Sequence, residues 1–170
     1  MKEVLLATLA VACAGGLQAQ DPLSADAKFW YTSIKGYVIR AAEKMPEANY
    51  SFKPAPEVRT FGQIVGHIAD DEYFFCGTVQ GAPKETEIEK TVTSKADLVM
   101  QLKKAFAYCD AVYDGFKDAQ AAEKMKTFAG ERTKLNWLDF NTAHMYEHYG
   151  NIVTYMRIKG LVPPSSEQSH

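Results

Sequence analysis

Residues 61–79 read FGQIVGHIADDEYFFCGTV, and apolar side chains recur in them at the spacing of one helical face. The apolar positions are Ile64, Ile68, Tyr73 or Phe74, and Phe75. Three more stretches show a helical pattern of comparable length. They lie at 24–44, 95–116 and 137–159. Four long helices without a strand pattern predict an all-α protein folded as a four-helix bundle.

Capping residues set the predicted helix starts. Ser24, Thr60 and Ser94 stand where N-caps belong, and Asn136 with Asp139 three residues later suits the start of the last helix. Proline or glycine follows the predicted ends, because neither residue favours continuation of a helix. The tail at 165–170 is polar, and we expect it to be loose.

Two connections are long. Residues 81–93 are charged and have no clear period, whereas 117–135 fit a short helix at 119–126 and then a loop or short extended segment at 127–134. The first connection, about 14 residues, could reach roughly 45 Å when extended. That length allows the chain to return along the bundle, so the second and third helices could run parallel.

Two cysteines, Cys76 and Cys109, lie in the second and third helices. Each is about 15 residues into its helix, so parallel helices would place them at similar heights, roughly 22 Å along. A disulfide then needs the two helices to be neighbours and the cysteines to face each other. We favour the alternative of two unpaired, buried thiols.

The composition is that of one ordinary globular domain. The chain has 170 residues, 46% hydrophobic and 24% charged, with a net charge of -2. Its only pair of adjacent basic residues is Lys103-Lys104. A nucleic-acid partner is not expected, because phosphate binding needs a clustered basic surface.

Residues 1–19 have the pattern of a secretory signal peptide. Lys2 precedes an apolar run at 4–14, and a cut ahead of Gln20 would leave a bundle domain at 20–164. The run is too short to span a bilayer, so no integral span is expected in the mature chain. We expect an exported protein, periplasmic or secreted. A retained N-terminal helix and lipid anchoring at Cys13 are the alternatives.

Three histidines carry the clearest chemical signal. His144 and His148 are four residues apart and share a helical face, which lets two imidazoles meet at one metal ion. His67 would complete the set if the second and fourth helices are antiparallel. Three histidines with an open fourth position suit a catalytic zinc site, and nickel also accepts imidazoles. The alternative is three histidines buried in the core.

Nearby polar residues are candidates for catalysis and ligand binding. Asp71 shares the face of His67, and Glu147 follows His144 by three residues, so either could move protons or stay on the surface. Tyr155, seven residues after His148, could hydrogen-bond a ligand in the pocket. The letters HMYEH at 144–148 also match a metalloprotease signature, but only Glu167 in the tail remains as its acidic ligand. We therefore reject that interpretation.

These segments resemble the DinB-like (YfiT-like) family over about residues 24–164. The resemblance rests on FGQIVGHIA at 61–69, MPE at 45–47, KP at 53–54, HMYEHYGN at 144–151, YMR at 155–157 and GLVPP at 160–164. It implies an up-down-down-up bundle and one divalent metal held by His67, His144 and His148. It also implies a small-molecule substrate and a low-molecular-weight thiol as cosubstrate. Related bundles often pair, which makes a homodimer an expectation.

The leading hypothesis is a metal-dependent enzyme, a thiol S-transferase first and a hydrolase second. The signal-like segment at 1–19 departs from a family whose thiols are cytosolic. The second hypothesis is a non-enzymatic metal- or ligand-binding module of the cell envelope. The third is a structural bundle in which the histidines only pack.

Overall fold

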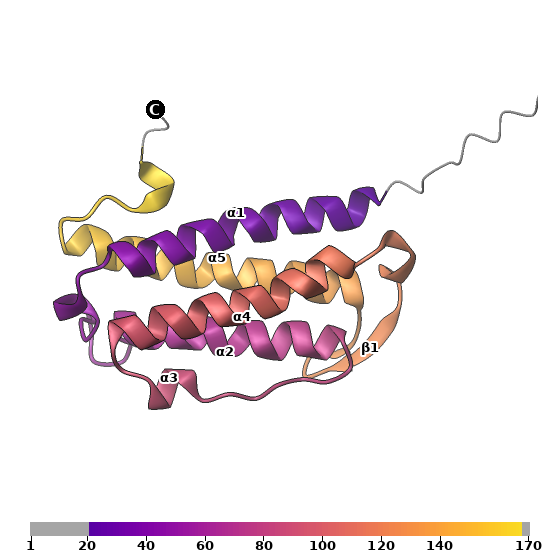
Figure 1. Cartoon of the computed structure of the whole chain (residues 1–170), viewed down its shortest axis with the longest axis horizontal. Helices are drawn as coiled ribbons and strands as arrows, with labels where there is room; N and C mark the ends of the chain where they lie inside the picture. Colours follow the sequence, from indigo (N-terminus) through magenta and orange to yellow (C-terminus); the bar gives the residue numbers. More distant parts are fainter. Residues whose placement is uncertain (1–20, 168–170) are drawn as a thin grey trace, which may run out of the picture.

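The computed structural model describes residues 21–167 and shows four long helices side by side (Figure 1). They are α1 (Pro22–Lys44), α2 (Phe61–Val79), α4 (Lys95–Gly115) and α5 (Lys134–Ile158). Helix α2 packs against α4 and α5, and α1 packs against the same two helices. The order around the bundle is therefore α1, α4, α2, α5, and the core lies between them.

Contacts between helices establish their directions. The Cys76–Cys109 bond and the approach of Leu98 to Gly62 show that α2 and α4 run parallel. Ion pairs from Lys28 to Asp114 and from Lys103 to Glu43 show that α1 and α4 are antiparallel. Contacts of His67 with His148 and of Glu72 with Asn141 make α2 and α5 antiparallel. The predicted up-down-down-up four-helix bundle is confirmed.

The cysteines form a disulfide, so the preference for two free thiols was wrong. Cys76 on α2 and Cys109 on α4 have Cα atoms 5.4 Å apart, within the range that a disulfide spans without backbone movement. Both conditions set out from the sequence are met, because α2 and α4 are neighbours and the two side chains face each other in the core. The bond joins two helices that also pack against each other in the core.

Helix starts follow the capping residues in part. Thr60 forms a full capping box with Gln63, and Ser94 accepts from the backbone of Asp97. The start of α5 differs, because Thr133 caps it and accepts from the backbone of Asn136. Ser24 is also not a cap. It lies inside α1, and its hydroxyl donates to Asp118, which ties the start of α1 to the segment after α4.

The long connections hold a one-turn helix that was not expected and a hairpin whose second strand falls in the segment at 127–134, which was expected to be a loop or short extended segment. A one-turn helix, α3 (Ile88–Thr91), lies against α2 within the charged connection. The short helix expected at 119–126 is absent, and only the turn Asp118–Gln120 is helical there. An antiparallel hairpin follows, β1 (Lys124–Thr127) and β2 (Gly130–Thr133). Its strands are mostly polar and exposed, so no buried apolar alternation marked them.

The ends of the chain are described in part. After α5, residues 165–167 are exposed, although Ser165 donates to Tyr149 and Glu167 pairs with Lys44 at 2.6 Å. The predicted signal peptide at 1–19, with Cys13, lies outside the described residues. Among residues 21–167, no helix combines the length and apolarity needed to cross a bilayer.

Removal of the disulfide should weaken the bundle. It closes a loop with a sequence separation of 33, and a loop of that size gives a stabilisation of about 2–4 kcal/mol. We expect the Cys76→Ala/Cys109→Ala variant to lose that much free energy of unfolding in urea titrations. Dithiothreitol should lower the stability of the wild type and leave the variant unchanged. Equal stability of oxidised and reduced wild type would contradict this.

Candidate metal centre

Four side chains meet between α2 and α5. His67 and Asp71 come from α2, and His144 and His148 come from α5. One nitrogen or oxygen from each lies within 4.8 Å of all the others, which is close enough for one ion to reach all four. The Nε2 atoms of His144 and His148 are 2.9 Å apart. The three histidines that the sequence singled out are therefore brought together.

The helix geometry explains why the four converge. Within α2, and again within α5, the two residues are separated by four positions, so each pair lies on one face. The antiparallel packing of the two helices then turns the two faces toward each other. The rings of His67 and His148 are 4.7 Å apart between centroids, and those of His67 and His144 are 5.6 Å apart.

Burial favours the uncharged form of all three imidazoles. Removal from water lowers the pKa of His67 and His144, and it lowers the pKa of His148 to about 3. The like charge that the other two rings would carry lowers the pKa of His148 further. Since only a neutral imidazole can donate its lone pair to a metal, the three rings are in the form that binds an ion.

Asp71 adds a fourth donor that the three-histidine scheme did not include. Its Oδ2 lies 3.1 Å from His67 Nε2 and 3.3 Å from His144 Nδ1. This oxygen is buried, and no hydrogen bond satisfies it within the described residues. Burial raises the pKa of the Asp71 carboxyl to about 7. A buried oxygen without a hydrogen bond beside three neutral imidazoles is the donor set expected of a metal centre.

Glu89 contacts the centre from α3, and no pattern in the sequence marks it as a site residue. Its Oε2 lies 3.2 Å from His67 Nδ1, while His67 Nε2 is the atom that faces Asp71. The guanidinium of Arg59 donates to the other Glu89 oxygen at 2.9 Å. A carboxylate on the far nitrogen fixes the orientation of a metal-binding imidazole. Glu89 was missed because it lies in the charged connection without a period.

Helix α3 carries Glu89 to this position, and α2 holds it there. The carboxylate of Asp70 accepts hydrogen bonds from the backbone of Ile88 at 2.8 Å and of Glu89 at 2.9 Å. Gly66 permits the close approach, because a Cβ at that position would lie 2.7 Å from the Glu89 Cα. Gly66 is therefore needed for the close packing of α3 on α2, although its position inside a helix gives no sign of this.

A cavity of about 450 Å³ adjoins His148. Its lining residues are Glu57, Val58, Arg59, Ile64, Glu89, Glu147, His148, Asn151 and Tyr155. Glu147 is exposed at this cavity, and it is not among the four residues whose donor atoms meet at the centre. The Tyr155 hydroxyl donates to the Arg59 carbonyl at 2.9 Å, so it fastens the preceding loop to α5.

Glu72 lies beneath the centre in the core, and among residues 21–167 its side chain forms no ion pair. It is fully buried, and within the same residues its carboxyl group accepts one hydrogen bond, from Asn141 at 3.4 Å. Burial raises the pKa of the Glu72 carboxyl well above its usual range. No sequence pattern marks Glu72 or Asn141 as functional. Both side chains are polar and would be expected on the surface. Only the packing of α2 on α5 shows that the two are buried together.

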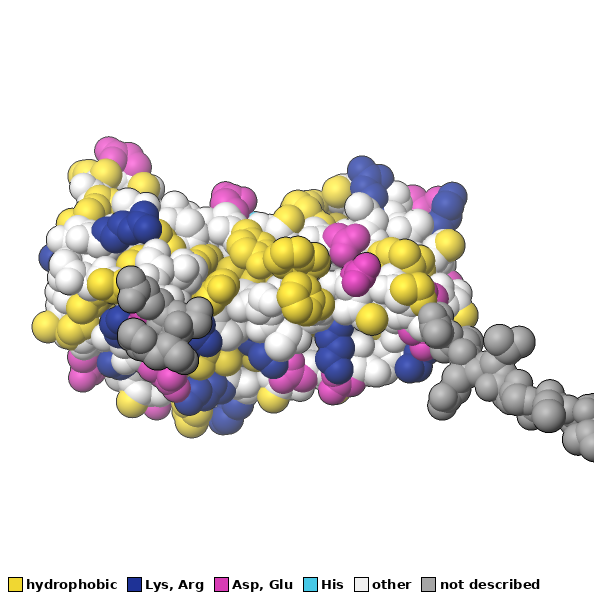
Figure 2. Space-filling model, turned by 90° about the horizontal axis from the view of Figure 1, so that it is seen from above, with side chains coloured by type: hydrophobic (Ala, Val, Ile, Leu, Met, Phe, Trp, Pro, Cys, Tyr) yellow, Lys and Arg dark blue, Asp and Glu magenta, His cyan; other side chains and the backbone are white. Residues whose placement is uncertain are grey.

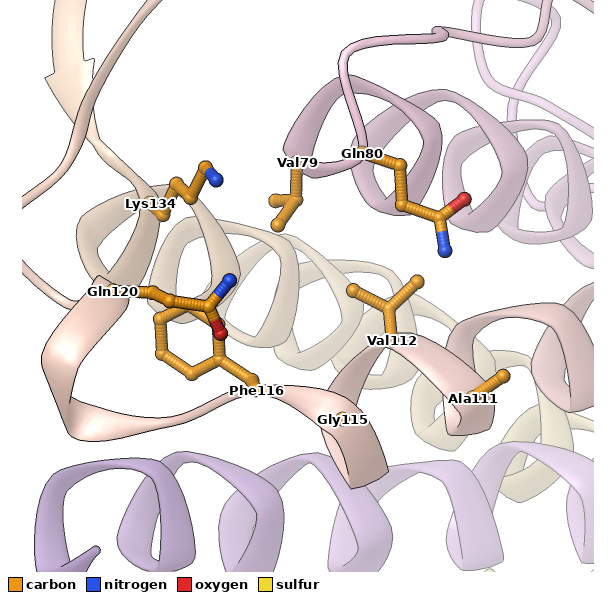
Figure 3. Close-up of a pocket in the computed structure, with 8 residues that line it drawn as sticks. All are labelled: Val79, Gln80, Ala111, Val112, Gly115, Phe116, Gln120 and Lys134. Carbon is orange, nitrogen blue, oxygen red and sulfur yellow. The ribbon is translucent and has the colours of Figure 1, made fainter.

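Other surfaces offer less chemistry. A cavity of about 320 Å³ lies where α2 and α4 end and α5 begins (Figure 3), and its one ionisable lining residue, Lys134, pairs with Glu123 at 2.6 Å. Figure 2 shows the face over α1, where exposed hydrophobic side chains gather but no described histidine is visible. The chemistry of the described residues is therefore concentrated between α2 and α5.

Comparison with known proteins agrees with this architecture. Residues 36–152 match the family model of the DinB superfamily. The chain belongs to the DinB superfamily. A comparison with curated proteins finds no match. The family assignment therefore rests on the superfamily match, which covers α2, α4 and most of α5 and includes all four residues of the centre.

Solved structures show the same DinB-superfamily fold. A DinB-like protein from Bacillus cereus has 18% identity and a TM-score of 0.71, over 81% of this chain and 93% of that one. A DinB-like protein from Bacillus subtilis has 20% identity and a TM-score of 0.68, over 85% and 99%. A mutant of a mycothiol-dependent maleylpyruvate isomerase has 12% identity and a TM-score of 0.62, over 76% and 60%.

Enlarging Gly66 should displace α3. In Gly66→Ala, the new methyl group would meet the Glu89 backbone, and we expect a loss of about 1–3 kcal/mol in free energy of unfolding. Gly150→Ala is the matched control, because nothing lies within 4 Å of a Cβ there and alanine favours a helix by up to about 1 kcal/mol. Thermal unfolding measures both. Equal effects of the two changes would disprove the close-approach argument.

Glu72 should make stability fall as the pH rises. In the folded protein, the Glu72 carboxyl keeps its proton at pH values above 4.5, the pKa that the group has in the unfolded chain. The folded state therefore binds more protons than the unfolded state, and the free energy of unfolding falls with each further pH unit until the folded pKa is passed. We expect the metal-free Glu72→Gln variant to gain at least about 1 kcal/mol over wild type between pH 5 and pH 8. Urea unfolding at both pH values tests this. Glu85→Gln, on an exposed loop, should behave as wild type.

Proposed function

We propose that this chain binds one divalent transition metal through His67, His144 and His148, with zinc as the first choice and nickel as the second. The observation that carries the proposal is the convergence of three neutral imidazoles, one buried and two partly buried, on an Asp71 oxygen that has no hydrogen bond within the described residues. A site with three imidazole nitrogens suits zinc and nickel better than calcium or magnesium, which prefer oxygen ligands.

The surrounding residues support binding and proton transfer. Glu89 orients His67, and Arg59 keeps Glu89 in place. Asp71 lies beside His67 and His144, so its carboxylate is placed to accept a proton from a thiol or water molecule at the centre. When bound, the metal would lower the pKa of a thiol or water molecule that joins it. Glu147 remains a second candidate for proton transfer, from the rim of the cavity.

The reaction we favour is transfer of a low-molecular-weight thiol to an electrophile, with hydrolysis as the second choice. The cavity beside His148, at about 450 Å³, has the size of a small-molecule site. One structural relative is, by its name, a mycothiol-dependent isomerase. Tyr155 would line this site and hold the Arg59 segment, because its hydroxyl is already bonded to that backbone.

Export is part of the proposal. A disulfide between two helices is typical of proteins in an oxidising compartment, and the signal-like segment at 1–19 agrees with it. A periplasmic or secreted location means that the thiol must also be present outside the cytosol.

A specific observation favours the alternative, a binding module without catalysis. If Asp71 joins the three histidines as a ligand, a four-coordinate ion leaves no position open for substrate. Such a closed site would bind metal and stabilise the fold but would activate nothing.

Cobalt-loaded protein titrated with cysteine distinguishes the two functions. We expect a new near-ultraviolet absorption band as the thiol joins the ion, and a thiol-dependent reaction with 1-chloro-2,4-dinitrobenzene in the zinc-loaded protein. Both signals should be lost in His144→Ala and kept in His170→Ala, which changes the one histidine outside the proposed set. Tight cobalt binding with no effect of the thiol would favour the binding module instead.

A further inference from the structure

The hairpin between α4 and α5 brings an aromatic side chain to the surface near the metal centre. Phe128 occupies its two-residue turn, between the paired residues Thr127 and Gly130. The Thr127 hydroxyl accepts from the Ala129 backbone and donates to the Gly130 carbonyl at 2.7 Å, so the turn has a defined shape. In Figure 1 the hairpin lies at the end of the bundle, beside the start of α5.

Phe128 remains 69% exposed although it reaches other aromatic rings. Its ring lies 5.1 Å from Trp137, and 6.2 Å from both Phe74 and Phe140, between centroids. Phe74 is half-buried and Phe140 is 41% exposed. We call these three rings, Phe74, Phe128 and Phe140, the aromatic shelf, and the buried Trp137 lies beneath them.

The aromatic shelf is continuous with the metal centre. The ring of Phe140 is stacked on His144, with centroids 6.1 Å apart and planes 12° apart. Phe75, from α2, also contacts the His144 ring at 5.7 Å. A group held at the centre would therefore have an apolar, planar surface one helical turn away along α5. Contiguous exposed aromatic side chains of this kind commonly mark a binding site.

The two sides of the centre differ in chemistry. Beyond His148 lies the cavity with Glu57, Arg59 and Glu147, which is charged. Beyond His144 lies the aromatic shelf, which has no charged member. A charged thiol fits the first side, whereas an apolar planar group is matched by the second, because aromatic rings attract one another when stacked or edge-on.

We propose that the aromatic shelf binds the aromatic part of a small-molecule substrate whose polar end reaches the metal centre. Only the binding of the polar end rests on the proposed metal and thiol function. Binding of the aromatic part does not need a metal, because the shelf consists of protein side chains. Phe128 is then a specificity-determining residue, and the hairpin exists to place it. The electrophile of a thiol transfer is the substrate that this side would take.

The first test uses metal-free protein. In a Trp30→Phe background, Trp137 is the only tryptophan, and it lies beneath the shelf. We expect 4-nitrobenzyl alcohol to quench its fluorescence with saturation. Phe128→Ser should weaken this binding about tenfold, the size of one lost aromatic contact. Phe29→Ser is the matched control, because Phe29 is a 61% exposed ring on α1, and it should leave binding unchanged.

The second test uses cobalt-loaded protein and two thiols. Phenylmethanethiol should bind about tenfold more tightly than 2-mercaptoethanol, and Phe128→Ser should abolish the preference. If neither thiol binds, the proposed thiol function fails, and the quenching experiment still decides whether the shelf binds an aromatic group.

Unsaturable quenching, or equal quenching in Phe128→Ser, overturns the inference. So would a dimer that Phe128→Ser converts to monomer by light scattering, because the shelf would then be covered by a second copy.

Discussion

Antiparallel packing of α2 against α5 is the contact on which the centre depends. It opposes the His67 face of one helix to the His144 face of the other, and it buries Glu72 against Asn141 in the same layer. On the neighbouring face of α2, the close approach of α3 to Gly66 adds Glu89 to the centre. A shift of α5 along α2 by a single turn, about 5.4 Å, would separate the histidines from one another and Glu72 from Asn141.

The layer between these helices is costly to fold without a ligand. Burial keeps the imidazoles uncharged, leaves an Asp71 oxygen without a hydrogen bond, and encloses a carboxyl at Glu72. Such groups destabilise a core by a few kcal/mol each unless something compensates. The disulfide between α2 and α4 and the stacked Tyr31 and Tyr113, 3.9 Å apart, supply stability nearby. A bound ion would compensate the site directly, because ligands that bind only the folded state stabilise it.

Much of the fold could be predicted from the sequence, since four long amphipathic stretches leave few other arrangements. The bounds of α2 agree with its capping signals, and His144 and His148 were found because their spacing is local. The rest depends on contacts between distant segments. Glu89 has no local signal, and the hairpin is too polar to show an alternating pattern. The disulfide needed the neighbour order of the helices, which connection length alone leaves open. Phe128 falls in a segment expected to be a loop or short extended segment, and only the structure shows that its ring lies beside Phe140.

The central claim is that the histidines hold one ion. Elemental analysis of protein purified without a histidine tag, after incubation with zinc or nickel and removal of excess metal, tests it most directly. The account predicts about one ion per chain in the wild type, and none in His67→Ala or His144→Ala proteins that remain helical by circular dichroism. Wild-type protein without metal, or variants that keep the full ion content, would contradict it.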